Sequence, residues 1–171
     1  HPNNGWLNLS GNEHVKIENN SVLEPDDGNF TIDGWFKTSR SDQQQIYGDY
    51  GVGDIVIQIV SGNFRFFYRN SGGDDNDKTI TGTLNDGEWH YFACIRDGDD
   101  NVIYIDTENA VTTTEAVSGN INSGNSKYIG SLQGLSTEVF YGSLDEIRLY
   151  NRALSATEIT KNYKHGLSKH S

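Results

Sequence analysis

Gly142-Ser-Leu-Asp-Glu-Ile-Arg-Leu-Tyr-Asn-Arg-Ala-Leu-Ser-Ala-Thr-Glu-Ile159 is the stretch of sequence that decides the fold. Polar and apolar residues alternate over 146–150, which is the period of a strand with one buried face. Leu144, Ile147 and Leu149 are its apolar anchors. The first half of the stretch therefore predicts a half-buried strand.

The second half of the stretch carries a helix start. Ser155-Ala-Thr-Glu158 is a capping box, in which each end residue can bond the backbone amide of the other. Leu154 and Ile159 flank the box as a hydrophobic staple. The pattern predicts one short helix that begins near Ala156, directly after the strand.

Working outward, the composition indicates an all-β domain. The 171 residues are enough for one domain, which we place at 1–171 with a core of about 6–160 and a polar tail at 161–171. The chain has 19 glycines and two prolines, together with many Asn, Asp, Ser and Thr residues, as expected for short strands joined by polar turns.

The charge and apolar pattern exclude several classes of partner. A net charge of −11 argues against nucleic acid and against anionic lipid, since both need a basic surface. No apolar run approaches the ~20 residues that span a bilayer, so membrane insertion is not expected. Residues 1–5 do not resemble a signal peptide, and the sequence reads as a mature or excised domain. The single cysteine, Cys94, lies in an apolar run and is expected to be buried.

Three further segments read as strands with flanking turns: Phe30-Thr-Ile-Asp-Gly-Trp-Phe-Lys37, Asp86-Gly-Glu-Trp-His90 with the strand after it, and Val102-Ile-Tyr-Ile-Asp106. With the stretch at 142–159, they resemble the ordered motifs of bacterial laminin G-like, concanavalin A-like jelly-roll domains. The resemblance runs from about Leu9 to Ile159. It implies two antiparallel sheets packed as a sandwich with Greek-key connections, and it implies a secreted, extracellular protein.

Hydrolases and lyases share this sandwich, so catalysis is tested first. Retaining glycosidases need two carboxylates roughly 5 Å apart, which means alternate residues on one strand. Ser143 and Ile147 flank Asp145 at that spacing, so no pair forms there, and the segment 105–108 offers an even spacing only from Asp106 to Glu108, at a strand end. Triads of the serine or cysteine type lack a nucleophile motif. We therefore expect a domain that is not an enzyme.

Calcium is the metal that the resemblance implies. Relatives hold a calcium ion between the opening turn and the closing strand, which maps here to Glu13, Asn12 and Asp145, with carbonyls near Gly11. Calcium takes several oxygen ligands, often from distant loops. Two rival acidic clusters, 74–77 and 97–101, are interpreted as solvated turns. The expected role of the ion is structural.

Ligand binding is predicted on the strand Phe64-Arg-Phe-Phe-Tyr-Arg69. If Phe64, Phe66 and Tyr68 point into the core, the intervening residues line the outer face. These are Arg65, Phe67 and Arg69. An exposed Phe ring can stack on a sugar, and an arginine pair can bind hydroxyls or select carboxylate or sulfate on an acidic glycan.

A glycine-flanked segment is predicted to form the wall of the same site. It carries Tyr47, Asp49 and Tyr50, with Gln58 nearby on the next strand. Aromatic and planar polar side chains are what sugar recognition needs.

Two functions follow from these features. The first is a non-catalytic carbohydrate-binding module or lectin that recognises a polysaccharide or glycan, alone or within a larger multidomain enzyme. The alternative is an extracellular protein-binding adhesion domain of the laminin G type. A groove floored by aromatic rings favours the first, and an exposed acidic calcium rim with apolar neighbours favours the second.

Overall fold

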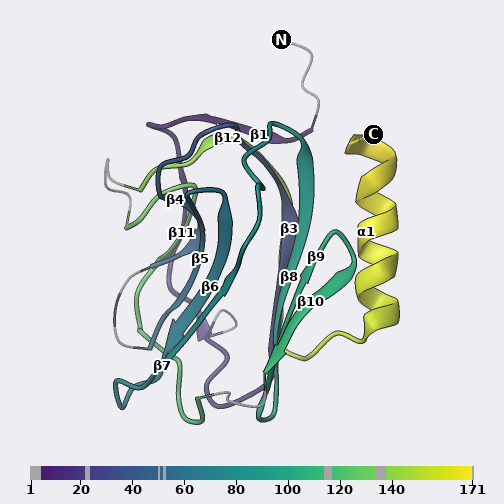
Figure 1. The fold of residues 1–171 in the computed structure, drawn as a ribbon. Coiled ribbons are helices and arrows are strands. Elements are labelled where there is room, and N and C mark those ends of the chain that lie inside the picture. Colours follow the sequence, from purple (N-terminus) through teal and green to yellow (C-terminus); the bar gives the residue numbers. More distant parts are fainter. Residues whose placement is uncertain are drawn as a thin grey trace.

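The computed structural model describes residues 5–21, 24–49, 51, 53–113, 117–133 and 138–170, with the side chains of 108–110 excepted. Within these residues, two six-stranded sheets pack face to face, and one α-helix lies outside them (Figure 1). All strand pairs are antiparallel. This confirms the predicted jelly-roll sandwich with a helix near the C-terminus.

Sheet A has the strand order β1-β12-β3-β8-β9-β10. Its strands are β1 (Leu7–Ser10), β12 (Tyr141–Tyr150), β3 (Phe30–Lys37), β8 (Trp89–Asp97), β9 (Asp100–Ile105) and β10 (Glu108–Thr113). The predicted strand at 146–150 is thus the second half of β12, which lies between β1 and β3.

Sheet B has the order β2-β11-β4-β5-β6-β7. Its strands are β2 (Val15–Ile17), β11 (Lys127–Ile129), β4 (Gln44–Gly48), β5 (Ile55–Val60), β6 (Asn63–Arg69) and β7 (Asp75–Ile80). The interpretation of 74–77 as a solvated turn is wrong for 75–77, because these residues pair with β6 in β7. The turn at 97–101 is confirmed at Gly98 and Asp99, between β8 and β9.

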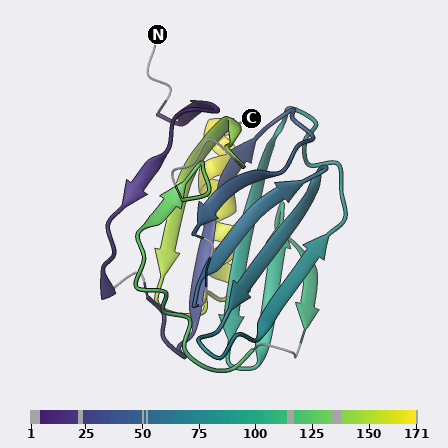
Figure 2. The ribbon, with the colours of Figure 1, turned by 90° about the vertical axis from the view of Figure 1, so that its left-hand side faces the viewer.

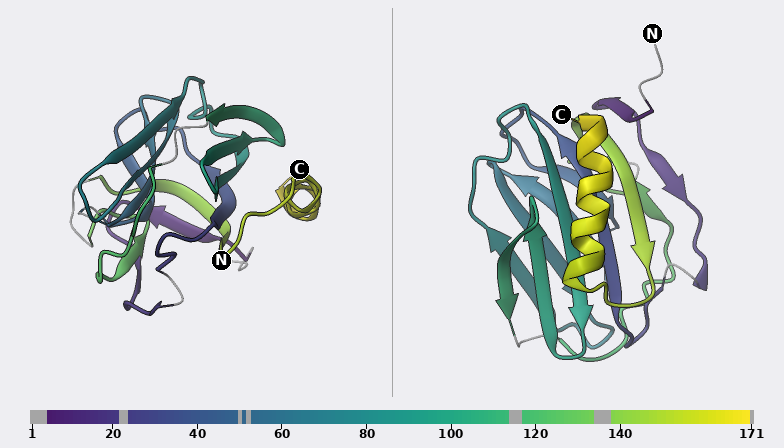
Figure 3. Two further views of the ribbon diagram at one scale, coloured as in Figure 1. Left: turned by 90° about the horizontal axis from the view of Figure 1, so that it is seen from below. Right: turned by 90° about the vertical axis from the view of Figure 1, so that its right-hand side faces the viewer.

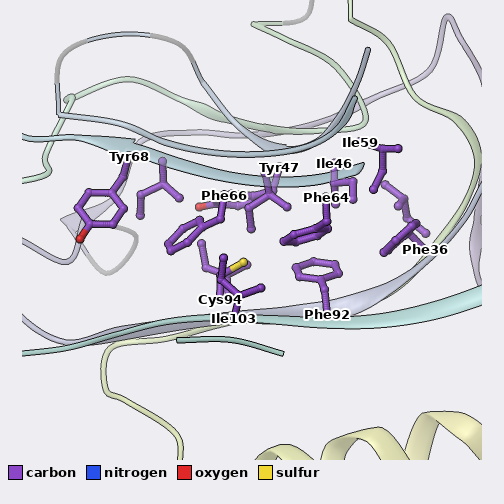
Figure 4. Packing of buried hydrophobic residues seen from close by; sticks show 14 of the residues in the cluster. Phe36, Ile46, Tyr47, Ile59, Phe64, Phe66, Tyr68, Phe92, Cys94 and Ile103 are labelled. Carbon is purple, nitrogen blue, oxygen red and sulfur yellow. The ribbon is translucent and has the colours of Figure 1, made fainter. Parts of the chain in front are cut away.

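Aromatic and branched apolar side chains fill the space between the sheets (Figure 4). Phe64 of sheet B lies over Phe92 of sheet A with ring centroids 5.4 Å apart. Cys94 is buried in this core, as predicted. Burial of the thiol raises the pKa of Cys94 well above its ordinary value.

A bulge in β12 allows two of its apolar residues, three positions apart, to face the core. The pairing with β3 shifts between Asp145 and Arg148, and Glu146 has a φ of 51°. Since one extra residue is taken up at the bulge, Leu144 and Ile147, three residues apart, both pack on the core. The predicted apolar anchors are confirmed.

The helix α1 (Ala156–His170) covers the outer face of sheet A (Figure 3, right). It begins where the capping box predicts. The Ser155 amide donates to Glu158 Oε2 at 2.9 Å, and the Glu158 amide donates to Ser155 Oγ at 3.4 Å. The helix continues to His170, so the prediction of a short helix followed by a polar tail at 161–171 is wrong for 161–170.

The tail folds as helix because sheet A offers it a partner surface. Trp35 points outward from β3, and its indole stacks on the ring of Tyr163 with centroids 5.4 Å apart. Gly166 is buried against the same indole, where a side chain would overlap Trp35 Nε1. These contacts hold the second half of α1 on the sheet.

A buried carboxylate also ties α1 to the sheet. Asp33 accepts hydrogen bonds from the Tyr91 hydroxyl at 2.7 Å and from Asn162 Nδ2 of the helix at 2.8 Å. The Arg148 guanidinium lies 3.5 Å away. Burial raises the pKa of Asp33, although these neighbours oppose the shift.

Candidate ligand-binding site

The outer face of sheet B is where the sequence places the ligand (Figure 2). The alternation in β6 follows the predicted faces. The core-facing residues are those expected, namely Phe64, Phe66 and Tyr68. The intervening residues lie on the outer side, beside β7.

Phe67 lies on this outer face but does not offer an exposed ring. Only 4% of the residue is accessible to solvent. The guanidinium carbons of Arg65 and Arg69 lie 5.2 and 5.5 Å from the ring centroid, within the range of cation–π contact. The prediction that Phe67 is exposed for stacking is wrong, because the two flanking side chains cover it.

Acids on β7 hold both arginines in place. Arg65 donates from Nε and Nη2 to the two carboxylate oxygens of Asp77, at 2.9 and 2.7 Å. Arg69 binds both carboxylate oxygens of Asp75 in the same manner. Since each guanidinium already faces a carboxylate, the arginine pair is not arranged to select an acidic glycan.

Tyr47 is part of the core and not of an exposed wall. The pairing of β4 with β5 shifts between Gln45 and Tyr47, so the alternation changes phase and Tyr47 faces inward with Ile57. The residue is 2% exposed, and burial raises its pKa. The placement of Tyr47 outside the core is therefore wrong. Tyr50 lies outside the described residues.

Asp49 borders a cavity of about 310 Å³ at the β4–β11 side of sheet B. The cavity is lined by Asp49, Asn125, Ser126, Tyr128 and Gln133. These side chains offer a carboxylate, two amides, two hydroxyls and one aromatic ring. We call this the Tyr128 cavity.

Backbone geometry makes room for the Tyr128 ring. Tyr128 on β11 pairs with Gly48 on β4, so no side chain stands beside the ring on that strand. Gly48 has a φ of 122°, and a Cβ there would collide with the carbonyl of Ile55. On the other side, the ring of His14 lies 5.7 Å from that of Tyr128. Glycine at 48 thus serves both the chain geometry and the opening of the cavity.

A buried ion pair lies next to the cavity. Lys127 alternates with the cavity residues Ser126 and Tyr128 and points to the opposite side. Its ammonium lies 2.9 Å from Asp54 Oδ1 and 4.0 Å from Glu24 Oε1, and donates to Ser123 Oγ at 2.6 Å.

Negative charge predominates around this ion pair. Burial raises the pKa of Asp54 to about 6, while Lys127 opposes the shift and Asp49 adds to it. Asp49, Asp54 and Glu24 supply three carboxylates against one ammonium. The surroundings of the Tyr128 cavity are therefore unfavourable for a negatively charged ligand.

The residues assigned to calcium do not come together as one site. Glu13 closes the turn after Ser10, where it accepts from the Ser10 amide at 2.7 Å and from the Asn12 amide at 3.4 Å. These bonds lower the pKa of Glu13. Asp145 follows Leu144, which pairs with Leu7 at the other end of β1. At ~3.3 Å per residue, most of strand β1 separates the two carboxylates.

The Glu13 turn also presents the wrong kind of atom to a cation. Its polar contacts are N–H and O–H donors from Ser10 and Asn12, which suit an anion, whereas calcium needs converging oxygens. Among the residues that the structure describes, no group of three or more His, Cys, Asp or Glu side chains is arranged to hold a metal ion. The mapped residues therefore do not fit the ion.

Asp106, one of the two carboxylates considered for glycosidase chemistry, has structural partners. This carboxylate accepts from the Tyr91 amide at 2.9 Å and contacts His90 Nδ1 at 2.8 Å. His90 also contacts Asp86. Burial alone would lower the pKa of His90, but the two carboxylates raise it. The side chain of Glu108 is outside the described residues.

Four of the five residues that line the Tyr128 cavity were not predicted from the sequence. They are Asn125, Ser126, Tyr128 and Gln133. One signal in the sequence could have indicated the cavity. Tyr128 lies between Lys127 and Ile129 on β11, and because these two neighbours face inward, Tyr128 must face outward. Within the described residues, no helix is both long and apolar enough to cross a membrane.

Three solved structures have the same fold, and two of them are titled as binding domains. The binding domain of botulinum neurotoxin serotype G superposes with a TM-score of 0.77 at 17% identity, over 95% of this chain and 42% of that one. That of Paraclostridial Mosquitocidal Protein 1 gives 0.73 at 13% identity, over 95% and 46%. Domains LG4-5 of the mouse laminin α1 chain give 0.70 at 17% identity, over 90% and 44%. The chain thus spans less than half the length of each.

A search of curated protein sequences finds no relative. The family model described as the concanavalin A-like lectin/glucanases superfamily, of laminin G type, matches residues 9–160. This range extends from β1 into α1 and includes both sheets. The chain therefore belongs to the laminin G-like group of the concanavalin A-like lectin/glucanase superfamily.

Proposed function

We propose that this protein is a non-catalytic, lectin-like domain that binds a glycan in the Tyr128 cavity. The observation that carries the proposal is the set of side chains around one ring. Carboxylate, amide and hydroxyl groups can bind sugar hydroxyls as donors and acceptors, while the phenol ring can pack on an apolar sugar face. At about 310 Å³ the cavity is at the small end for ligand sites, which suits one sugar residue of a longer chain.

The charge of the site narrows the ligand to an uncharged sugar. Asp49 lines the cavity, and Asp54 and Glu24 lie close by around the ammonium of Lys127. Lys16, which pairs with Tyr128 across β2 and β11, is itself bound to Glu18. A uronate or sulfate would be repelled here. The ligand proposed for this cavity is therefore a neutral polysaccharide, and the domain acts outside the cell, alone or within a longer enzyme or adhesin.

The alternative is a laminin G-type domain that binds a protein receptor. The observation in its favour is that the similar solved structures include ones titled as binding or receptor-binding domains. The two functions differ in what occupies the cavity. A protein partner would cover the rim of the sandwich and would not depend on hydroxyl groups inside the Tyr128 cavity.

A glycan array followed by titration of its best neutral hit tests the proposal. Tyr128→Ala and Asp49→Asn should each weaken binding by roughly tenfold or more, because stacking or a charge-assisted hydrogen bond is lost. The matched control is Thr79→Ala, an exposed residue on the same face of sheet B, which should bind like the parent. Chromatography of the incubated oligosaccharide should show it uncleaved.

Two results would contradict this function. If folded Tyr128→Ala and Asp49→Asn bind as well as the parent while Arg69→Gln does not, the ligand lies on β6 as the sequence predicted. If no glycan binds and a protein receptor is captured instead, the domain is an adhesion module.

Calcium stabilisation stays a prediction of the family resemblance. An ion that binds only the folded state raises stability by RT ln(1 + [L]/Kd), about 2.7 kcal/mol at one hundred times Kd. The resemblance predicts a melting midpoint several degrees higher in millimolar calcium than in chelator, with magnesium as the control. The geometry of Glu13 and Asp145, which do not converge on one site, predicts an equal midpoint. An equal midpoint in calcium and chelator would contradict a structural calcium ion.

A further inference from the structure

A second cavity lies on the other sheet, at the end of the sandwich where α1 ends. It has a volume of about 400 Å³. Its lining comes from the end of β3, the loop after it, the start of β12 and the turn before β8. The lining residues are Lys37, Thr38, Ser39, Arg40, Gly87, Tyr141, Gly142 and Ser143. We call it the Lys37 cavity.

Two cations and four hydroxyl-bearing side chains line this cavity, which is opposite in charge to the Tyr128 cavity. Lys37 is half-buried and, within the described part of the chain, forms no ion pair. Arg40 is bound through Nε and Nη2 to Asp42, at 3.1 and 2.9 Å. Asp42 therefore offsets the charge of Arg40, and Lys37 supplies the uncompensated positive charge.

Contacts between the loop after β3 and the start of β12 hold the lining of the cavity in place. The Arg40 guanidinium carbon lies 4.2 Å from the centroid of the Tyr141 ring. Thr38 Oγ1 donates to the Tyr141 carbonyl at 2.7 Å, which ties the loop after β3 to β12. Gly142 has a φ of 144°, and a Cβ there would collide with the carbonyl of Lys37. Glycine is thus required for the close approach that forms the cavity floor.

Two half-buried indoles lie next to Lys37 but outside the lining of the cavity, and the Trp89 ring packs on that of His170 with centroids 4.1 Å apart. Trp89 pairs directly with Lys37 across β3 and β8, on the outer face of sheet A. The Trp6 ring lies edge-on to that of Trp89 at 5.6 Å, and Trp6 Nε1 donates to Asn8. Asn8 in turn accepts from the cavity residue Ser143 at 2.8 Å. A cation next to hydroxyl groups suits a ligand that carries hydroxyl groups and a negative charge.

We propose that the Lys37 cavity is a second glycan site, which binds a saccharide residue bearing a carboxylate or sulfate group. Lys37 contacts the anionic group, and the hydroxyls of Ser39 and Ser143 bind the neighbouring oxygens. The net charge of −11 repels polyanions at a distance, so any affinity for them has to come from a local site such as this one.

Titration with two anionic probes and one neutral probe tests the site. Tetragalacturonate carries carboxylates, a heparin-derived tetrasaccharide carries sulfates, and maltotetraose carries neither. At least one anionic probe should bind saturably, and its amide shifts in NMR spectra should centre on Lys37, Ser39 and Ser143 rather than on Asn125 and Tyr128. The stronger of the two anionic probes identifies the group recognised. Because the readout is residue by residue, the result does not depend on the neutral-glycan site.

The variant Lys37→Gln provides the second test of the site. It should weaken anionic binding by roughly tenfold, since a charge-assisted contact is lost, while the exposed control Lys161→Gln leaves the affinity unchanged. The proposal is overturned if neither anionic probe binds, if the shifts centre elsewhere, or if Lys37→Gln binds as tightly as the parent. Should the variant fail to fold, the amide shifts of the parent protein decide.

Discussion

Lys127→Met is expected to destabilise the domain by about 3–5 kcal/mol near neutral pH, which is the usual cost of removing one partner of a buried ion pair. Lys127 and Asp54 have side chains only 2% and 0% exposed, and Glu24 lies on the same ammonium. Without that charge, two carboxylates remain in a region that solvent does not reach. Urea unfolding of parent and variant measures the difference.

The same variant should recover part of its stability in acid. The folded-state pKa of Asp54 is about 6, above its ordinary value of 3.8, because burial disfavours the charged form. A raised carboxylate pKa contributes stability that is complete below the unfolded value and is lost as pH rises through the folded value. In Lys127→Met the carboxylate also lacks its cation, so its pKa rises further.

The decrease in the free energy of unfolding caused by Lys127→Met should accordingly be smaller at about pH 5 than at about pH 7.5, by at least about 1 kcal/mol. Lys161→Met removes an exposed charge from α1 and serves as the control, with little change at either pH. Equal losses at the two pH values would show that the carboxylates near Lys127 are not the cause.

Gly166→Ala should destabilise the protein, although helix propensity alone predicts that it stabilises it. In an exposed helix interior, alanine in place of glycine stabilises by about 1 kcal/mol. At Gly166 the added methyl would overlap Nε1 of the buried Trp35. Overpacking of this kind costs about 1–3 kcal/mol, because the helix must move away from the sheet.

Thermal melting of Gly166→Ala against Ser168→Ala makes the comparison within one helix. Ser168 is exposed, so its replacement should be neutral or slightly stabilising. Tryptophan fluorescence should shift to the red in Gly166→Ala as Trp35 becomes hydrated. A variant as stable as the parent, with unchanged fluorescence, would rule out the contact between Gly166 and Trp35 as a support of the fold.

The sequence predicts the sandwich well because its signals are local. Alternation in β6 places Phe64 and Phe66 in the core, and the capping box sets the start of α1. Where it fails, the cause is a partner distant in the sequence. The second half of α1 has a polar sequence whose helix depends on Trp35 of β3, more than a hundred residues earlier.

Candidate sites were harder to predict for the same reason. A bulge in β4 turns Tyr47 inward, and acids on β7 hold Arg65 and Arg69 over Phe67. Neither effect is visible in the alternation of a single strand. Asp49 was identified, but the rest of the Tyr128 cavity comes from segments about 75 to 85 residues later, which only the pairing of β11 with β4 brings near.

The contact between Trp6 and His170 has a mechanical consequence. The two rings are 6.2 Å apart, so the ends of the described chain meet at one corner of the molecule (Figure 1). If both ends of the domain were pulled through attached polypeptide, the force would therefore act at that corner. It would peel β1 from β12 and lift α1 from its last turn, one contact after another, instead of shearing whole strands at once. Under tension β1 and α1 would separate first, while the other strands of the two sheets and the aromatic core between them stayed together.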